Sequence, residues 1–318
     1  MSFAEHTKPG YRSGFVAIVG PANAGKSTLL NAVLGKKVSI VTSKPHTTRT
    51  RVLGVKTRDD GQLIFLDTPG FVRRSDSGEL ARYINATISD VVSGVDLTML
   101  VLDSSRLRGR EGELKGIARA IEERGIPMPR VIALNKVDLI EKDLLLPIIA
   151  ECHRTFAQDG RTIDILPVSA RRKEGLVELE RLLVSLLPEG PELFPSDTLT
   201  DQTEATIAAE IVREKLFLEL REELPYSVAV LVEGFHEDGK LLRINAVILV
   251  ERQSQKSIVV GARGSKLKAI GSAARLELEK LFNTHIYLEL FVRVEPDWTR
   301  TKRGISRAGY GDLNSRSR

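Results

Sequence analysis

The stretch FVAIVGPANAGKSTLLNAVLG, residues 15–35, decides the fold of the first half of this chain. Its first five residues form an apolar run typical of a buried strand, and Ser27–Gly35 have the spacing of a helix that ends at a glycine. Between them, Gly20–Ser27 match the pattern G-x-x-x-x-G-K-[ST] in the strand-to-helix context that this pattern requires. Backbone N–H groups in such a loop, at the amino end of a helix, favour a phosphate group.

This loop is predicted to cradle the phosphates of a nucleoside triphosphate, the alternative being a purely structural turn. Lys26 should reach the β- and γ-phosphates, and the hydroxyl of Ser27 should bind Mg²⁺. The residues predicted to contact the nucleotide here are Gly20, Pro21, Ala22, Asn23, Ala24, Gly25, Lys26, Ser27 and Thr28.

Three further motifs, DTPG, NKVD and Ser169-Ala170, each end an apolar run, and together with the loop they predict a guanine nucleotide. DTPGF offers Asp67 to the metal and the Gly70 N–H to the γ-phosphate. NKVD offers the Asp138 carboxylate to the ring N–H and amine of guanine, a donor pair that adenine lacks. Ligands of α/β sheets bind at these strand ends, so we predict GTP and GDP as ligands. The predicted contacts are Asp67, Thr68, Pro69, Gly70, Phe71, Asn135, Lys136, Asp138, Ser169 and Ala170.

The segment KKVSIVTSKPHTTRTRV, between the loop and DTPG, has no helical period and is predicted to be a switch, with a plain loop as the alternative. Within this segment we predict Thr48 as a metal ligand, with Thr47 as the alternative. The predicted metal ligands are therefore Ser27, Thr48 and Asp67. Lys26, Thr48 and Gly70 are the predicted catalytic residues. Phe71 cannot orient water as a glutamine does in Ras-like proteins, so we expect slow intrinsic turnover.

The order of apolar runs and helical patterns predicts an α/β domain with a mostly parallel sheet over residues 14–187, after an N-terminal extension, 1–13. The Asp59-Asp60-Gly61 turn predicts one hairpin within it. A proline-rich linker follows at 188–202, and residues 203–298 read as a smaller α+β domain that opens with a long helix stopped by Pro225.

A second glycine-rich loop, GARGSK, lies in this smaller domain, after SIVV, which we interpret as a strand, and before a helix over 265–282. Only two residues separate its first two glycines, so it does not match a triphosphate loop. A G-x-x-G turn suits the backbone of single-stranded RNA, as in KH modules, and a structural turn is the alternative. Leu267, Ile270, Ala274, Leu278 and Leu281 should form the buried face of the helix. The predicted RNA contacts are Gly261, Ala262, Arg263, Gly264, Ser265, Lys266 and Lys268.

The charge of the chain lies in its tail. The net charge is +5, and residues 299–318 hold six basic side chains against one acidic one. We interpret this Gly/Ser/Arg-rich segment as a basic, disordered tail that is either only solvated or grips nucleic acid. The single cysteine fits a reducing cytosol.

Together these segments resemble the Era family of bacterial ribosome-assembly GTPases, from about Gly14 to Trp298. The resemblance is carried by GPANAGKSTLLNAVLG, KPHTTRTRVLGV, DTPGF, NKVDL, VREKLFLELREELPYSVAV, ERQSQKSIVVGARG and YLELFVRV. It implies a P-loop GTPase domain followed by a type II KH domain, binding near the 3′ end of small-subunit rRNA, and partial association with the inner membrane.

The resemblance also implies that Asn23 holds K⁺ beside the phosphates. We expect a cytoplasmic monomer that acts in small-subunit assembly. Two alternatives stay open, a constitutive RNA-binding module with a vestigial GTPase and a membrane-associated signalling GTPase without an RNA role.

Overall fold

The chain forms two compact units, one made mainly of residues before Gln202 and the other mainly of residues from Gln202 onward. The computed structural model describes residues 8–42, 44, 47–71, 78–107, 111–157, 160, 162–220 and 227–310. Two features interpreted above, Pro225 and residues 311–318, lie outside them, as do Ser43, Pro45 and His46 of the predicted switch segment.

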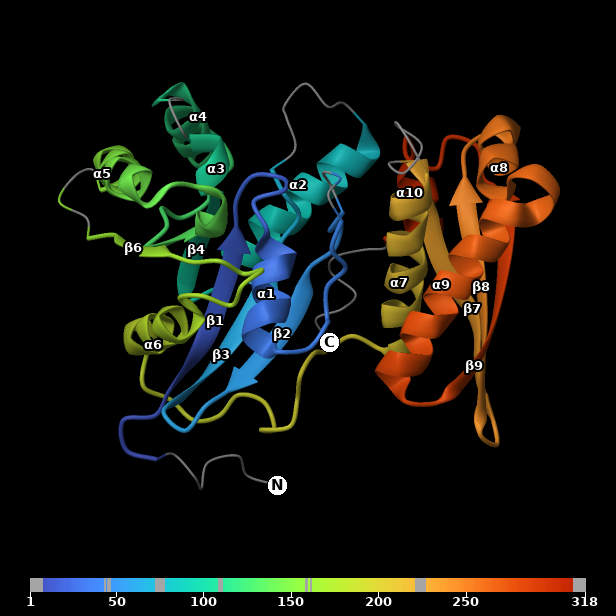
Figure 1. The fold of residues 1–318 in the computed structure, drawn as a ribbon, viewed down its shortest axis with the longest axis horizontal. Coiled ribbons are helices and arrows are strands. Elements are labelled where there is room, and N and C mark those ends of the chain that lie inside the picture. Colours follow the sequence, from blue (N-terminus) through green and yellow to red (C-terminus); the bar gives the residue numbers. More distant parts are fainter. Residues whose placement is uncertain are drawn as a thin grey trace. The chain divides into compact units, whose positions relative to one another are not determined.

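The first unit contains a six-stranded sheet in the order β2-β3-β1-β4-β5-β6 (Figure 1). Every neighbouring pair is parallel except β2 and β3, which form the predicted antiparallel hairpin. The strands are β1 Arg12–Val19, β2 Val52–Thr57, β3 Gly61–Asp67, β4 Leu97–Asp103, β5 Val131–Asn135 and β6 Asp164–Pro167.

Helices lie on this sheet because its central strands are buried on both faces. Strands β3, β4 and β5 are buried from end to end, as expected of a parallel sheet covered on both sides. The helices are α1 Lys26–Leu34, α2 Glu79–Val92, α3 Ser104–Leu107, α4 Glu111–Glu122, α5 Leu145–Phe156 and α6 Leu176–Leu186. The predicted α/β fold is confirmed, with the short turns η1 Val137–Leu139 and η2 Lys142–Leu144 after β5.

The proline-rich segment 188–201, nearly all of the linker predicted at 188–202, packs on the first unit. The buried amide of Gln62 accepts from the backbone N–H groups of Leu193 and Phe194 and donates to the Phe194 carbonyl at 2.8 Å. The backbone N–H of Val55 donates to the Leu199 carbonyl at 2.9 Å. These bonds tie the segment to β2 and β3, so the divide between the units falls at its end.

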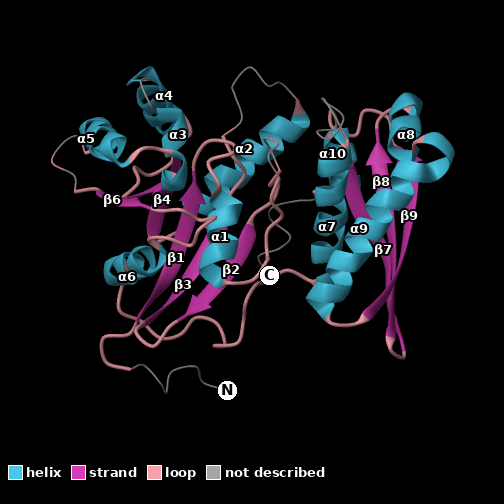
Figure 2. Ribbon diagram, in the orientation of Figure 1, coloured by secondary structure: helices cyan, strands magenta, loops and turns pink. Residues whose placement is uncertain are grey.

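The second unit contains a three-stranded sheet, in which β7 and β8 are antiparallel and β8 and β9 are parallel (Figure 2). Its elements are α7 Glu204–Glu219, β7 Ala229–Asp238, β8 Leu241–Val250, α8 Gln253–Val260, η4 Ala262–Gly264, α9 Ser265–Phe282, β9 His285–Val294 and α10 Lys302–Arg307. Apolar residues of α7 and α9 pack on one sheet face and form its core. On α9, the predicted face is confirmed for Ile270, Ala274 and Leu278, which are buried, whereas Leu281 is exposed.

The segment after Trp298 is ordered as far as Tyr310, so the prediction of a disordered tail is wrong for residues 299–310. Ile305 on α10 and Tyr310 are buried beside Trp298, in a cluster with Val247 and Leu249 of β8. Those two β8 residues alternate with the ones that face α7 and α9, so this segment covers the opposite face of the sheet. Three buried apolar residues, Ile305, Ala308 and Tyr310, anchor this segment, although it has no regular repeat of apolar residues.

The described helices include none that is both long and apolar enough to cross a membrane.

Candidate functional site

Five loops meet at the carboxyl edge of the parallel sheet. The loop 20–25 follows β1, Asp67 ends β3, Asp103 ends β4, Asn135 ends β5, and Ser169 follows β6. Because these strands are neighbours, the motifs that lie far apart in the sequence come together there, as predicted.

The loop 20–25 closes tightly because two of its positions admit only glycine. Gly20 has φ +148°, and a Cβ there would lie 2.4 Å from the Val101 carbonyl oxygen. Gly25 has φ +93°, and a Cβ there would lie 2.4 Å from Nδ2 of Asn135. Helix α1 begins at the next residue, Lys26, so the first N–H groups of the helix face this loop and favour an anion.

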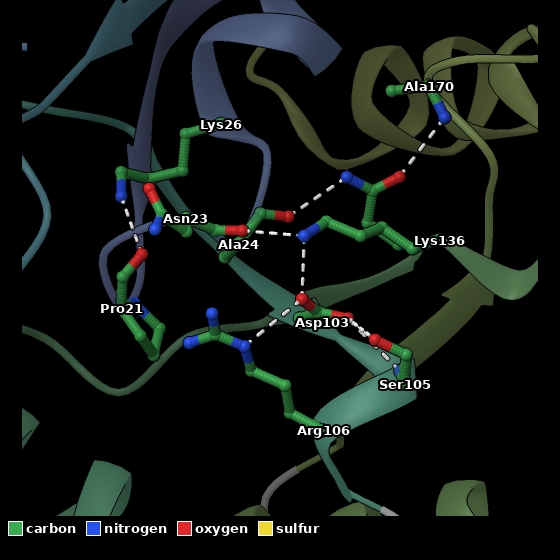
Figure 3. Close-up of polar contacts among 10 residues, drawn as sticks. Pro21, Asn23, Ala24, Lys26, Asp103, Ser105, Arg106, Lys136 and Ala170 are labelled. Carbon is green, nitrogen blue, oxygen red and sulfur yellow. Dashed lines mark hydrogen bonds and ion pairs between the residues drawn. The ribbon is translucent and has the colours of Figure 1, made fainter. Parts of the chain in front are cut away.

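Lys26 is buried within the loop that it closes. Its Nζ donates to the carbonyl oxygens of Gly20 at 3.0 Å and of Pro21 at 2.9 Å, and the second bond is drawn in Figure 3. Burial lowers the pKa of Lys26 to about 8, against the opposing pull of Asp67. A buried ammonium without a bonded carboxylate is costly, and a bound polyphosphate would supply the missing negative charge.

The three predicted metal ligands lie together. The Ser27 hydroxyl donates to Oδ2 of Asp67 at 2.6 Å and lies 2.9 Å from Oγ1 of Thr48. Burial raises the pKa of Asp67 to about 6, and its Oδ1 is buried without a hydrogen-bond partner among the described residues. Hydroxyl and carboxylate oxygens are the donors that Mg²⁺ prefers, and the unpartnered Oδ1 fits a metal or its bound water.

The two candidate threonines differ in the contacts of their hydroxyl groups. Thr47 Oγ1 lies 2.7 Å from Oγ1 of Thr42 and donates to the Lys44 carbonyl at 2.8 Å, so its hydroxyl is used within its own segment. Thr48 is the one beside Ser27. Sequence reasoning missed Ser39, whose hydroxyl donates to Oδ2 of Asp67 at 3.2 Å. In the sequence, Ser39 is one of several hydroxyl residues in its segment, and nothing in its spacing singles it out.

The DTPGF motif lies against the phosphate loop. A Cβ on Gly70 would lie 2.6 Å from the Cα of Ala22, so the backbone must approach the loop this closely. The Phe71 N–H donates to the Gly20 carbonyl at 3.3 Å, and the Phe71 ring lies under the Arg124 guanidinium. Thr68 anchors the turn to β1 through the Ile18 carbonyl. Position 71 is therefore occupied by an apolar ring and offers no polar side chain to the site.

The predicted base site is assembled by Asn135. Its Nδ2 donates to the Ala24 carbonyl at 3.0 Å, and its Oδ1 accepts from the Ala170 N–H at 3.1 Å. One side chain therefore joins the phosphate loop to the Ser169-Ala170 turn. Asp138 accepts from the Ser169 hydroxyl at 2.6 Å, which holds its carboxylate at the same turn.

Lys136 extends from NKVD over the phosphate loop. Its Nζ donates to the Asn23 carbonyl at 2.7 Å and to Oδ2 of Asp103 at 2.6 Å. Asp103 was not predicted, although its signal was present, because TMLVLD ends in an aspartate at the same strand end as Asp67 and Asn135.

The second predicted site lies on the second unit, at the turn between α8 and α9. The interpretation of SIVV as a strand is wrong, since these residues end α8. Gln255 caps that helix through the Glu251 and Arg252 N–H groups, and only Val259 is buried on it. The G-x-x-G turn therefore joins two helices.

This turn presents both a helix start and cations. Arg263 has φ 49° and ψ 32°, a left-handed conformation that is unfavourable for a side chain with a Cβ. Its side chain and that of Lys268 are exposed, whereas Lys266 is half-buried. The first turn of α9 contains no acidic residue. Ala262, Gly264 and Ser265 complete a turn suited to a phosphodiester backbone.

Comparison with known proteins finds similar proteins for both units. A family model described as "50S ribosome-binding GTPase" matches residues 15–136, and one described as "KH domain" matches residues 223–299. The chain is 43% identical to GTPase Era of Syntrophus aciditrophicus, over 95% of this chain and 96% of that protein. It is also 43% identical to GTPase Era of Geobacter metallireducens, over 94% and 98%.

Two solved structures of other proteins are similar to this structure along nearly the whole chain. One is an Era variant from Aquifex aeolicus bound to GDP and AlF4⁻, with a TM-score of 0.86 and 38% identity over 95% of this chain and all of that one. The other is Era in complex with MgGDPNP and nucleotides 1506–1542 of 16S ribosomal RNA, with the same TM-score, identity and coverage.

Proposed function

Because the chain belongs to the Era family of GTPases, we propose that it is a GTP-controlled factor that binds small-subunit rRNA near its 3′ end and acts in small-subunit assembly. It is a GTPase with a P-loop domain and a KH domain, and it hydrolyses GTP to GDP and phosphate. The relative bound to nucleotides 1506–1542 of 16S rRNA carries the proposal, together with the exposed Arg263 and Lys268 at the turn before α9.

The RNA part is tested by crosslinking the protein to RNA in cells and sequencing the bound fragments. We expect enrichment of the 3′ end of the small-subunit rRNA. A matched pair of variants locates the contact, Arg263→Ala at the exposed turn and Arg58→Ala, whose guanidinium pairs with Asp60 in the first unit. Loss of crosslinks in both variants, or in neither, would contradict the assignment to the turn.

Hydrolysis is explained by positioning and charge. Lys26 would bind the β- and γ-phosphates, while Ser27, Thr48 and Asp67 would hold Mg²⁺. When bound, Mg²⁺ neutralises charge on the phosphate oxygens. The Gly70 N–H would meet the γ-phosphate. Because Phe71 cannot orient the attacking water, we propose slow intrinsic turnover.

We propose that Asn23 holds K⁺ beside the phosphates and so partly replaces the missing water-orienting group. Asn23 has φ 64° within the phosphate loop, where its carbonyl is held by Lys136. Turnover measured in KCl should exceed turnover in NaCl at equal ionic strength, and Asn23→Ala should remove the difference. Equal wild-type rates in the two salts would exclude this role.

The nucleotide state would control RNA binding through the segment that contains Thr48. Thr48 lies beside Ser27 and, through it, Asp67, so a γ-phosphate with its metal would order this segment. We expect rRNA affinity to differ between the GDP and GTP-analogue states. Identical affinities would contradict the coupling while leaving hydrolysis and RNA binding intact.

We propose a cytoplasmic monomer with some peripheral contact at the inner membrane. Cell fractionation before and after a high-salt wash tests the membrane contact, and light scattering tests the monomer. Absence from the membrane fraction at low salt would exclude that contact.

A further inference from the structure

The carboxylate of Asp103 lies beside the predicted base site. None of the nucleotide motifs described above gives it a role. Asp103 ends β4 and is paired in register with Asn135, the first residue of NKVD, on β5. Its Oδ2 accepts from Nζ of Lys136 at 2.6 Å, and the same Nζ donates to the Asn23 carbonyl at 2.7 Å. Figure 3 shows the ammonium between the two acceptors.

The carboxylate is held rigidly by its own turn. Its Oδ1 accepts from the N–H of Ser105 at 3.1 Å and from the Ser105 hydroxyl at 2.6 Å. The Arg106 guanidinium lies 3.5 Å from Oδ2 but is half exposed, whereas the Asp103 side chain is only 7% exposed. A carboxylate fixed at this end of β4 therefore determines where the Lys136 ammonium lies.

The two residues joined by this ammonium both have unfavourable backbones. Asn23 and Lys136 each have φ 64°, in the left-handed region that residues with a Cβ rarely adopt. Such conformations persist only where surrounding contacts enforce them. The hydrogen bond from Lys136 to Asn23 joins them directly, and Asp103 supplies the charge that keeps the ammonium there.

We propose that Asp103 is a positioning residue for the guanine nucleotide. It anchors the Lys136 ammonium on the Asn23 carbonyl, which sets the lysine stem as one wall of the base site and fixes the loop before Gly25. Lys136 Cε would lie 3.8 Å from a Cβ on Gly25, so the stem lies directly over the loop. The inference rests on the guanine-nucleotide site described above.

Asp103→Asn tests this, because it keeps the shape and removes the charge. A charge-assisted hydrogen bond of this kind corresponds to about a 10- to 100-fold change in an equilibrium constant. Fluorescent GDP should therefore bind about 10- to 100-fold more weakly. Because Asp103 does not touch Lys26, Ser27 or Thr48 in the described contacts, the loss should be one of nucleotide affinity.

A control and a double-mutant cycle separate positioning from general damage. Asp96→Asn makes the same change just before the other end of β4, where Asp96 accepts from the Phe15 N–H at 2.7 Å, and GDP affinity should not change. In a Lys136→Ala background, Asp103→Asn should have no further effect, since it acts through Lys136.

Three results would overturn the inference: unchanged GDP affinity in Asp103→Asn, an equal loss in the Asp96→Asn control, or the same loss in the Lys136→Ala background. Melting temperatures of the nucleotide-free variants show whether each one is folded. A failure of the nucleotide site itself is distinguishable, because the wild-type protein would then not bind GDP.

Discussion

The buried carboxylate of Asp67 should make the nucleotide-free protein less stable than the variant Asp67→Asn. Asp67 has no exposed surface, and burial raises its pKa from 3.8 to about 6. A group whose pKa is raised on folding contributes stability below its unfolded pKa and loses it as pH rises through the folded pKa. For Asp67 this loss lies between about pH 4 and pH 6, so its charge is a net cost at neutral pH.

The size of the effect follows from the two pKa values. The difference between 3.8 and about 6 corresponds to about 3 kcal/mol of unfolding free energy. Asparagine can still accept from Ser27 and Ser39, which now donate to Oδ2. The gain in Asp67→Asn should therefore be at most about 3 kcal/mol, or at most roughly 6–12 °C in melting temperature for a unit of this size, because the asparagine Nδ2 would take the place of the buried, unpartnered Oδ1.

The assay is thermal unfolding of nucleotide-free protein in EDTA at pH 7.5 and pH 5. Asp67→Asn should melt higher than wild type at pH 7.5, and the difference should shrink at pH 5. Its affinity for Mg²⁺-GTP should fall, because a metal ligand has lost its charge. Asp60→Asn is the matched control of opposite sign, since Arg58 lowers the pKa of Asp60. If Asp67→Asn melts lower than wild type at pH 7.5 while Asp60→Asn is mildly destabilised, the reasoning is wrong.

Three further predictions concern the switch segment, the RNA turn and the C-terminal segment. Thr48→Ala should lower the hydrolysis rate by about 100-fold, whereas Thr47→Ala should stay near wild type; single-turnover rates compare the pair, and equal losses would contradict the assignment. Arg263→Gly should raise the melting temperature of the second unit by relieving about 1 kcal/mol of backbone strain. It should also weaken RNA binding and reduce its salt dependence by about one charge, and an unchanged salt slope would exclude a phosphate contact. Ile305→Ala should destabilise the second unit by about 2–4 kcal/mol in urea unfolding, whereas a disordered segment would show no change.

The first unit was predictable because its signals are local. A buried strand is an apolar run, the phosphate loop has glycines at set spacings, and each nucleotide motif follows a strand directly. Thr48 was preferred over Thr47 from the sequence, and the contact with Ser27 favours it.

The second unit shows where local signals fail. SIVV contains three β-branched residues, which favour strands, yet it ends a helix because its cap and the buried Val259 outweigh that preference. Likewise, the composition after Trp298 is that of a solvated tail. A few apolar side chains nevertheless bury against β8, and such long-range packing leaves no period in the sequence.

By itself, the sequence determined that the chain is a GTPase and predicted the motifs through which it binds the nucleotide, because that chemistry depends on residue types at short spacings. Only the tertiary structure decided which side chains support those motifs. Asp103 and Ser39 lie far along the chain from the groups they hold, and Gln62 in the same way holds the segment 188–201. Their roles arise from the pairing order of strands and the packing of segments, which bring together residues that no spacing rule connects.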